Sequence, residues 1–136
     1  MNLASCELCD SDGGEPLWRD DFCRVVLAND IDYPGFCRVI LNRHVQEMTD
    51  LSIADRTRLM TVVFAVEQVV REVVKPQKIN LASLGNVVPH MHWHVIPRFA
   101  DDKHFPNPIW GAAKRDANIR MVDVADLRKK VIAALS

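Results

Sequence analysis

Histidines occupy every second position in one short segment of this chain. His90, His92 and His94 are three of its five histidines, and the residues between them are apolar. In a β-strand, side chains at alternate positions project from the same face, whereas a helix would scatter them around its axis. The pattern therefore predicts a β-strand over residues 90–99, with three imidazoles on its polar face and an apolar face turned toward a core.

Three imidazoles on one face could do three kinds of chemistry. They could hold a metal ion, they could bind phosphate, or one could act as a nucleophile while its neighbours bind charge and move protons. Same-face neighbours on one strand lie about 6.6 Å apart, twice the strand rise, which is wide for three ligands of one tetrahedral ion. The spacing favours a groove for phosphate. The remaining alternative is an ordinary polar strand face that tolerates histidine, and the strict alternation argues against it.

A second candidate constellation is the segment Cys6-Glu7-Leu8-Cys9. Its spacing is that of half a zinc site, although a redox pair or two unreactive thiols are alternatives. No strand–helix–strand pattern surrounds it, which counts against a thioredoxin-like motif. Two further ligands would have to come from elsewhere in the chain. The other two cysteines, Cys23 and Cys37, lie in apolar β-like segments and are predicted to be small buried residues.

The composition is that of one globular domain. The chain has 136 residues, 49% of them hydrophobic and 26% charged, with a formal net charge of −1. No basic excess supports binding to nucleic acid or to a membrane surface, and no apolar run approaches the roughly 20 residues of a membrane span. The N-terminus lacks the pattern of a signal peptide, so we expect a cytoplasmic protein with reduced cysteines. We expect a single domain over 1–136, with an N-terminal segment 1–16 and a C-terminal extension 100–136.

Several strands must hold the histidine segment in place. Two β-rich runs joined by a Pro-Gly turn indicate an antiparallel hairpin. A later run of alternating residues leads through a Gly-Asn turn into the histidine segment. The predicted strands cover residues 17–19, 22–28, 36–41, 78–84 and 90–99.

One long helix is predicted from the N-cap residue Ser52 to about Val74, and its broad apolar face includes Phe64. A final helix is predicted over 124–135, and residues 100–120 show no clear period. The order of strands and helices predicts an α+β fold: a mainly antiparallel sheet with one long helix packed on it and a C-terminal helix.

The segment His90-Met91-His92-Trp93-His94-Val95-Ile96 matches HxHxHxx, where x is hydrophobic, at all seven positions. This is the signature of the histidine-triad (HIT) superfamily. From Cys6 to Phe99 the chain resembles the bacterial HIT hydrolases grouped with diadenosine polyphosphate hydrolases. The resemblance implies the HIT-like fold and a nucleotide hydrolase that cleaves a nucleoside polyphosphate or phosphoramidate at the α-phosphate. His92 would be the nucleophile that forms a nucleotidyl-histidine intermediate, and His94 would bind phosphate oxygens or assist the leaving group.

The resemblance also implies nucleotide-binding positions. A polar residue after the first long strand contacts the ribose in the family, and Asn29 or its neighbour Asp30 stands there. The turn before the histidines would offer phosphate-binding donors, from Asn86 and from the backbone of Val88. Trp110 could line a substrate pocket or a subunit contact, and His104 is expected in a solvated loop.

Certain HIT relatives, and galactose-1-phosphate uridylyltransferase in the same superfamily, hold zinc through a cysteine pair and two histidines. The resemblance therefore implies a structural zinc site formed by Cys6, Cys9, His44 and His90. A plain hydrogen bond between the two histidines is the alternative. No cofactor is expected to be required for catalysis.

Three other functions remain open at this point. The chain could be a nucleotidyl transferase of the same superfamily, a nucleotide-binding module with slow catalysis, or a metalloenzyme that uses all three histidines. The expected partner is a small-molecule nucleotide, with no nucleic acid and no membrane. The resemblance also implies a homodimer, with the long helix and neighbouring strands at its interface.

Overall fold

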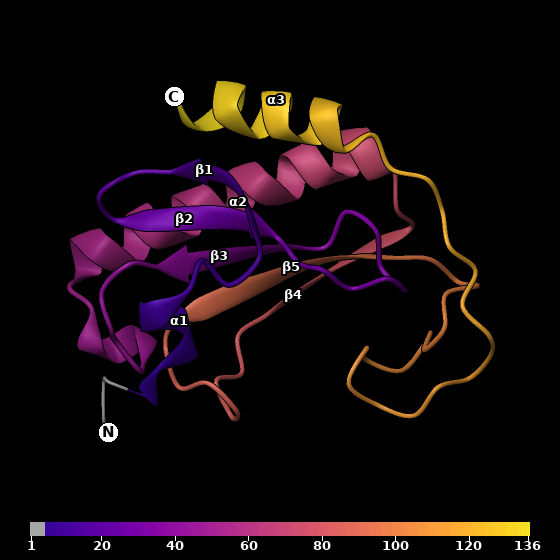
Figure 1. Cartoon of the computed structure of the whole chain (residues 1–136), viewed down its shortest axis with the longest axis horizontal. Coiled ribbons are helices and arrows are strands. Elements are labelled where there is room, and N and C mark those ends of the chain that lie inside the picture. The colour runs from indigo at the N-terminus through magenta and orange to yellow at the C-terminus, as the bar shows by residue number, and fades with distance from the viewer. Residues whose placement is uncertain (1–4) are drawn as a thin grey trace.

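The computed structural model describes residues 5–136, and its centre is a five-stranded antiparallel sheet with the two long helices on one face and a short N-terminal helix on the other (Figure 1). The strand order is β1-β2-β3-β5-β4, and every neighbouring pair is antiparallel. The α+β fold class is thus confirmed. The strands are β1 (Glu15–Arg19), β2 (Cys23–Leu27), β3 (Cys37–Leu41), β4 (Lys78–Ala82) and β5 (His92–Arg98). The helices are α1 (Glu7–Asp10), η2 (Met48–Asp50), α2 (Ile53–Val74) and α3 (Val124–Leu135).

The two faces of the sheet differ in character because successive side chains point to opposite sides. The face beneath α2 carries Cys23, Val25, Cys37 and Val39, all fully buried, so both cysteines pack as the sequence predicts. The other face carries polar side chains toward the centre of the sheet. There Arg38 of β3 lies directly opposite His94 of β5 in the strand register.

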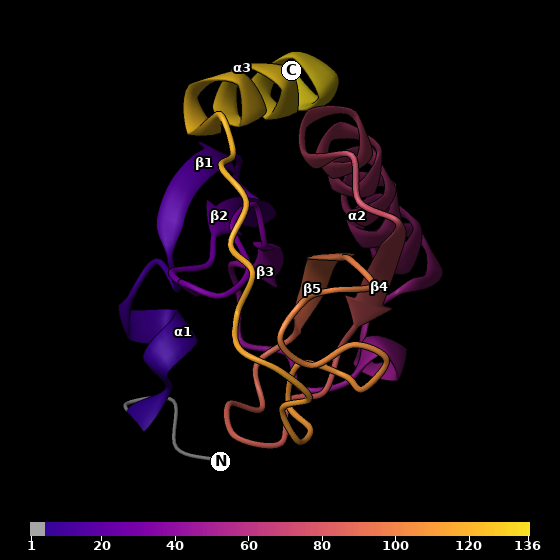
Figure 2. The same cartoon turned by 90° about the vertical axis from the view of Figure 1, so that its right-hand side faces the viewer.

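Helix α2 begins as the sequence predicts, because the Oγ of Ser52 accepts a hydrogen bond from the backbone N–H of Asp55 at 3.1 Å. The helix ends at Lys75, which adopts a left-handed conformation. Helix α2 covers the sheet, and α3 packs against both α2 and β1 (Figure 2). Phe64 departs from the prediction: its side chain is 54% exposed, because it lies on the outer side of α2.

Strand β5 begins at His92, so the prediction of three imidazoles in one strand row is wrong for His90. The residue after it, Met91, still pairs with β3 through the N–H of Leu41, which donates to its carbonyl, while its own N–H donates to Val45 beyond that strand. His90 therefore precedes the strand, and its imidazole lies against Cys6. The strand predicted over 78–84 is likewise shorter, ending at Ala82.

The segment between β5 and α3 contains no regular helix or strand, as predicted for residues 100–120. It is nevertheless held in place, because its first turn is built on a buried ion pair between Arg98 and Asp102. His104 lies half-buried here and bonds the hydroxyl of Tyr33 at 2.7 Å, so the expected solvated position is wrong. Among residues 5–136, no helix combines the length and the apolar character needed to span a bilayer.

Candidate active site and metal centre

His92 and His94 stand side by side on β5, with ring centroids 4.9 Å apart. They share a cavity of about 310 Å³ with the turn that precedes the histidine segment. Asn86 and Val88, both named from the sequence, lie in that turn. The structure therefore brings together four of the predicted site residues, and the lining is completed by Leu84, Gly85, Val87 and Trp110.

One hydrogen bond determines the protonation pattern of His92. Its Nδ1 lies 2.6 Å from the backbone carbonyl of His90. A carbonyl oxygen can only accept, so Nδ1 carries the hydrogen and Nε2 keeps its lone pair. Burial lowers the pKa of His92 below the ordinary histidine value, with a further lowering by the positive charge of Arg38. The ring is therefore neutral near pH 7, with its basic nitrogen free.

His94 lies deeper than His92. Burial lowers the pKa of its imidazole to about 3, and the neighbouring charges of His92 and Arg38 act in the same direction. Its Nδ1 is buried and has no hydrogen-bond partner within the described part of the chain. Phe36 and Trp110 flank its ring, with centroids 5.5 and 5.0 Å away. His94 is thus a neutral side chain held by aromatic contacts.

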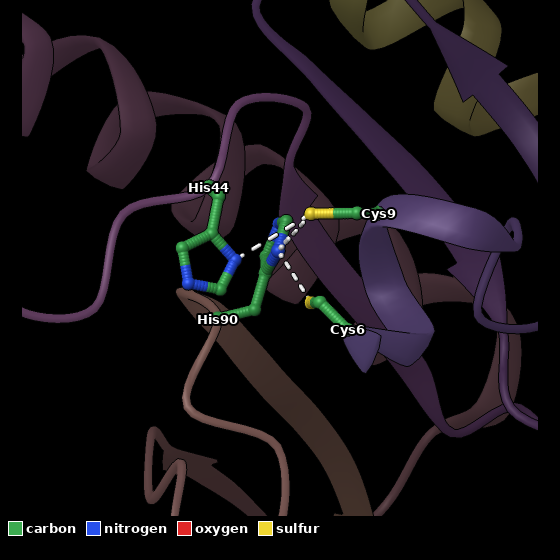
Figure 3. Close-up of side chains that lie close together, drawn as sticks. All are labelled: Cys6, Cys9, His44 and His90. Carbon is green, nitrogen blue, oxygen red and sulfur yellow. Dashed lines mark hydrogen bonds between the residues drawn. The ribbon is translucent and has the colours of Figure 1, made fainter. Parts of the chain in front are cut away.

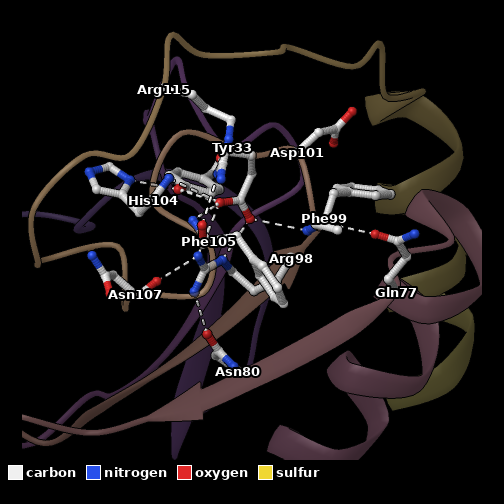
Figure 4. Close-up of polar contacts among 12 residues, drawn as sticks. Tyr33, Gln77, Asn80, Arg98, Phe99, Asp101, His104, Phe105, Asn107 and Arg115 are labelled. Atoms are coloured by element: carbon white, nitrogen blue, oxygen red, sulfur yellow. Dashed lines mark hydrogen bonds and ion pairs between the residues drawn. The ribbon is translucent and has the colours of Figure 1, made fainter.

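Trp110 reaches His94 because the segment that carries it is fastened to the end of β5 (Figure 4). The carboxylate of Asp102 accepts from the guanidinium of Arg98 at 2.8 and 3.0 Å and from three backbone N–H groups. Arg98 in turn donates to the carbonyl of Asn107, three residues before Trp110. These contacts hold the pKa of Asp102 well below its usual range, against the effect of burial. Asn80 bonds Arg98 at 2.7 Å.

The ribose residue suggested by the sequence lies in a neighbouring cavity. Asn29 and Asp30 line a space of about 640 Å³ whose other walls include Arg38 and the backbone at Gly13 and Gly14. Arg38 was not identified as a site residue from the sequence. The available signal was that Arg38 is the single charged residue within the apolar run 36–41.

The two cysteines and two histidines named as zinc ligands do meet (Figure 3). Their ligand atoms all lie within 4.8 Å of one another. The Nδ1 of His90 is 3.3 Å from the Sγ of Cys6 and 3.6 Å from that of Cys9, which is 3.5 Å from the Nδ1 of His44. Typical zinc bond lengths at a tetrahedral angle place sulfur and nitrogen ligands about 3.5–3.6 Å apart. The cluster could therefore bind a metal ion, and its dimensions suit zinc.

Neighbouring contacts orient this cluster. The Nε2 of His90 donates to the carbonyl of Leu41 at 2.6 Å, which leaves Nδ1 unprotonated and directed at the cysteines, as a metal ligand requires. Arg24 holds the short cysteine helix against the sheet, because its guanidinium donates to the carbonyls of Leu8 and Ser11 at 2.7 and 3.0 Å. The four side chains thus come from three separate segments that the sheet positions.

Comparison with known proteins agrees with these observations. Residues 15–101 match the family model for the HIT domain. A Schizosaccharomyces pombe protein named bis(5′-nucleosyl)-tetraphosphatase (asymmetrical) is 37% identical over 70 residues, which cover 48% of this chain and 38% of that protein. A Mycobacterium tuberculosis protein named AP-4-A phosphorylase is 29% identical over 85 residues, covering 58% and 44%. The chain therefore matches less than half of the length of either relative.

Two solved structures share the fold over nearly the whole chain. A histidine triad protein from Bradyrhizobium japonicum is 27% identical, with a TM-score of 0.71 over 90% of this chain and 89% of that one. One from Marinobacter aquaeolei is 26% identical, with a TM-score of 0.72 over 91% and 90%. Because the family model covers more than half of the sequence, and the fold agrees with these structures, the chain belongs to the histidine-triad (HIT) family.

Proposed function

We propose that the protein hydrolyses a nucleoside polyphosphate or phosphoramidate at the α-phosphate, with His92 as the nucleophile. The observation that carries the proposal is the 2.6 Å hydrogen bond from the Nδ1 of His92 to the carbonyl of His90. It leaves Nε2 as a free, neutral nucleophile that requires no separate base. The names of the two curated relatives, a tetraphosphatase and an AP-4-A phosphorylase, support this class of substrate.

The reaction proceeds in two displacements. In the first, Nε2 of His92 forms a bond to the α-phosphorus, and the bond to the leaving group breaks. His94 hydrogen-bonds a phosphate oxygen or the departing atom; a polyphosphate departs as an anion, whereas the amine of a phosphoramidate takes a proton from water as it leaves. In the second, water attacks the phosphorus and loses a proton to solvent, the P–N bond breaks, and the nucleoside monophosphate is released as Nε2 of His92 becomes free. The Asn86 amide and the backbone N–H of Val88 supply donors to the phosphate, as preorganised groups do elsewhere.

Asn29 belongs to the nucleoside end of this arrangement. It lines the cavity that also contains Arg38, where its amide can bond ribose hydroxyls. We keep Asn29 as the ribose residue, with Asp30 as its neighbour on the same wall.

A second candidate function is transfer of the nucleotidyl group to an acceptor other than water. One relative is named a phosphorylase, and phosphate as the acceptor would yield a nucleoside diphosphate in place of the monophosphate. The first displacement on His92 is common to both functions. Product analysis with and without inorganic phosphate distinguishes them.

We infer that Cys6, Cys9, His44 and His90 hold a structural zinc ion. Their distances and the hydrogen bond from His90 to Leu41 fit that ion. When bound, zinc would supply a cross-link between the N-terminal segment and the sheet. No step of the reaction at His92 takes place on the ion, which would act on that residue only by holding His90 in position.

We also infer a homodimer formed through α2. Ile53 and Phe64 are 76% and 54% exposed, and their spacing of eleven residues places them on one side of the helix. A dimeric mass by light scattering, reduced to a monomer by Phe64→Ser, is the expected result. A monomeric mass for the unsubstituted protein contradicts the inference.

The decisive experiment tests a panel of dinucleoside polyphosphates and nucleoside phosphoramidates against the unsubstituted protein and His92→Ala. We expect His92→Ala to lose turnover while its circular dichroism spectrum is unchanged. His104→Asn, outside both cavities and able to keep a bond to Tyr33, is the matched control and should stay active. Full activity of His92→Ala on a substrate that the unsubstituted protein cleaves would overturn the mechanism.

A further inference from the structure

Three arginines on the histidine face of the sheet differ in how their donors are used. The guanidinium of Arg24 donates to four protein acceptors, and that of Arg98 forms the buried ion pair with two further bonds. Arg38 is half-buried, yet within residues 5–136 its one hydrogen bond is from Nη1 to the carbonyl of Gly13, at 3.0 Å, and it has no ion pair. A guanidinium carries five N–H donors. Arg38 therefore keeps most of its donors available.

The position of Arg38 puts these donors beside the candidate reaction centre. Arg38 lies opposite His94 in the register of β3 and β5, and its side chain lines the cavity that also contains Asn29 and Asp30. That cavity, of about 640 Å³, is large enough for a small-molecule ligand. A partly buried cation with unused donors carries a desolvation cost, which a ligand with acceptor atoms would offset.

The charges around the cavity indicate what kind of ligand fits. Glu7, Asp12 and Asp30 contribute carboxylates to the walls; Asp12 is paired with Arg19, which leaves Glu7 and Asp30 against the single guanidinium of Arg38. This balance repels a phosphate group. It suits an uncharged ligand that offers acceptors to the guanidinium and N–H donors to the carboxylates. A nucleobase has this mixture of groups along its edges.

Among nucleobases, the purines match an arginine best. N7 is an acceptor in both purines, and in guanine O6 lies next to it, so that the guanidinium can donate to both atoms. Cytosine presents an amino donor at the corresponding position, and uracil a single carbonyl oxygen. The planar, forked guanidinium therefore distinguishes the bases, which a lysine ammonium would do less well.

We propose that Arg38 is the base-recognition residue of this protein and selects purine nucleotides, donating to N7 and, in guanine, also to O6. The inference rests on the proposed function, because the base reaches this cavity when the α-phosphate lies at His92. The backbone at Gly13 contributes by anchoring one nitrogen of the guanidinium, which leaves the others directed at the ligand. Gly13 has φ +79, a conformation that favours glycine.

The test measures the binding of GMP, AMP, CMP and UMP to the 136-residue chain by calorimetry. Binding does not depend on turnover. Arg38→Met keeps an unbranched apolar stem like the aliphatic part of arginine and removes its donors, while Arg38→Lys keeps the charge and removes the fork. Arg71→Met, an exposed arginine on α2, is the matched control. Melting temperatures establish that each variant is folded. If Arg38→Met does not fold, the binding data for Arg38→Lys carry the test.

We expect the unsubstituted protein to bind the two purine nucleotides at least about tenfold more tightly than the pyrimidine nucleotides, the scale of one good arginine–base contact. Arg38→Met should weaken purine binding about fivefold or more and leave pyrimidine binding nearly unchanged. Arg38→Lys should lose most of the purine preference.

Two results would overturn the inference. If Arg38→Met lost the same affinity for all four nucleotides, Arg38 would bond the phosphate. If it lost no affinity for any of them, Arg38 would not touch the ligand. Hydrolysis of the four symmetrical dinucleoside tetraphosphates, measured alongside, separates this inference from the proposed function. Hydrolysis without base-dependent binding overturns the role of Arg38 alone. Base-dependent binding without hydrolysis supports that role and overturns the proposed hydrolase.

Discussion

The backbone carbonyl of His90 accepts the Nδ1–H of His92 at 2.6 Å, while the imidazole of His90 faces Cys6 at 3.3 Å. One residue therefore takes part in both clusters: its backbone selects the tautomer of the candidate nucleophile, and its side chain belongs to the group that could hold a metal. A displacement of His90 would alter the basic nitrogen of His92. The two clusters are neighbours in structure and are also mechanically coupled.

Replacement of an exposed ligand should reveal this coupling. Cys9 is exposed, so Cys9→Ser removes a sulfur ligand without opening a core cavity. We expect zinc content to fall from about one ion per chain to less than about half, with a lower melting temperature, because metal binding and folding are linked. Through His90, kcat should fall more than KM rises. Elemental analysis, thermal melts and steady-state kinetics test this, with the exposed neighbour in Asp10→Asn as control. Negligible zinc in the unsubstituted protein would contradict the prediction.

The buried ion pair should make stability depend on pH in the acid range. The pKa of Asp102 is lowered from 3.8 in the folded protein, despite burial, chiefly by hydrogen bonds from Arg98 and from backbone N–H groups. The unfolded chain therefore binds this proton more readily. The carboxylate contributes its full stabilisation above about pH 4 and loses it as pH falls through the lower, folded pKa.

Asp102→Asn should accordingly be destabilised at pH 7, by about 3–5 kcal/mol, because Arg98 is left buried without a counter-charge. The free energy of unfolding of this variant should fall less steeply than that of the unsubstituted protein below pH 4. Urea unfolding at several pH values between 7 and 3 measures both effects, with the exposed Asp116→Asn as control. If the free energy of unfolding changed with pH in the same way for both proteins, Asp102 would not be the source of the pH dependence.

Trp110 should influence the leaving group. Its indole is 51% exposed and stands 5.0 Å from the ring of His94, so it offers a stacking surface in the cavity of the two histidines. We expect Trp110→Ala to lower kcat/KM about tenfold for dinucleoside polyphosphates, whose second base can stack there, at the scale of one base–aromatic contact. Substrates with a small leaving group should be affected less, and Trp110→Phe should restore most of the activity. An equal loss for both substrate classes would contradict a stacking role.

Individual strands and helices could be predicted because short stretches of sequence determine them. Apolar alternation is enough to indicate β2 and β3, and a serine cap followed by a long apolar face is enough to indicate α2. The grouping of Cys6, Cys9, His44 and His90 came from family resemblance, since nothing in their spacing brings residues from three segments together. Their proximity in the structure matches that expectation.

The features that were missed depend on contacts between distant segments. His90 lies before the strand with its imidazole against Cys6, and this contact between distant segments follows from no local pattern. Arg98 and Asp102 are ordinary charged residues in the sequence, and only the packing of Tyr33 and the segment 99–116 over them makes the pair buried. The exposure of Phe64 depends in the same way on tertiary packing, because it is set by which side of α2 faces the sheet.

The strand order has a consequence for how this protein is made. The first three strands follow one another along the chain and can pair early, but β3 keeps an open edge until β5 arrives from beyond α2. Closing that long connection is entropically costly, so the pairing of β3 with β5 is expected to be a slow step. Pulse-labelled hydrogen exchange during refolding should therefore protect the amides of β2 before those of β5. Until β5 pairs with β3, a nascent chain would present a bare, apolar strand edge. The protein is therefore most prone to aggregation between the pairing of the first three strands and the arrival of β5.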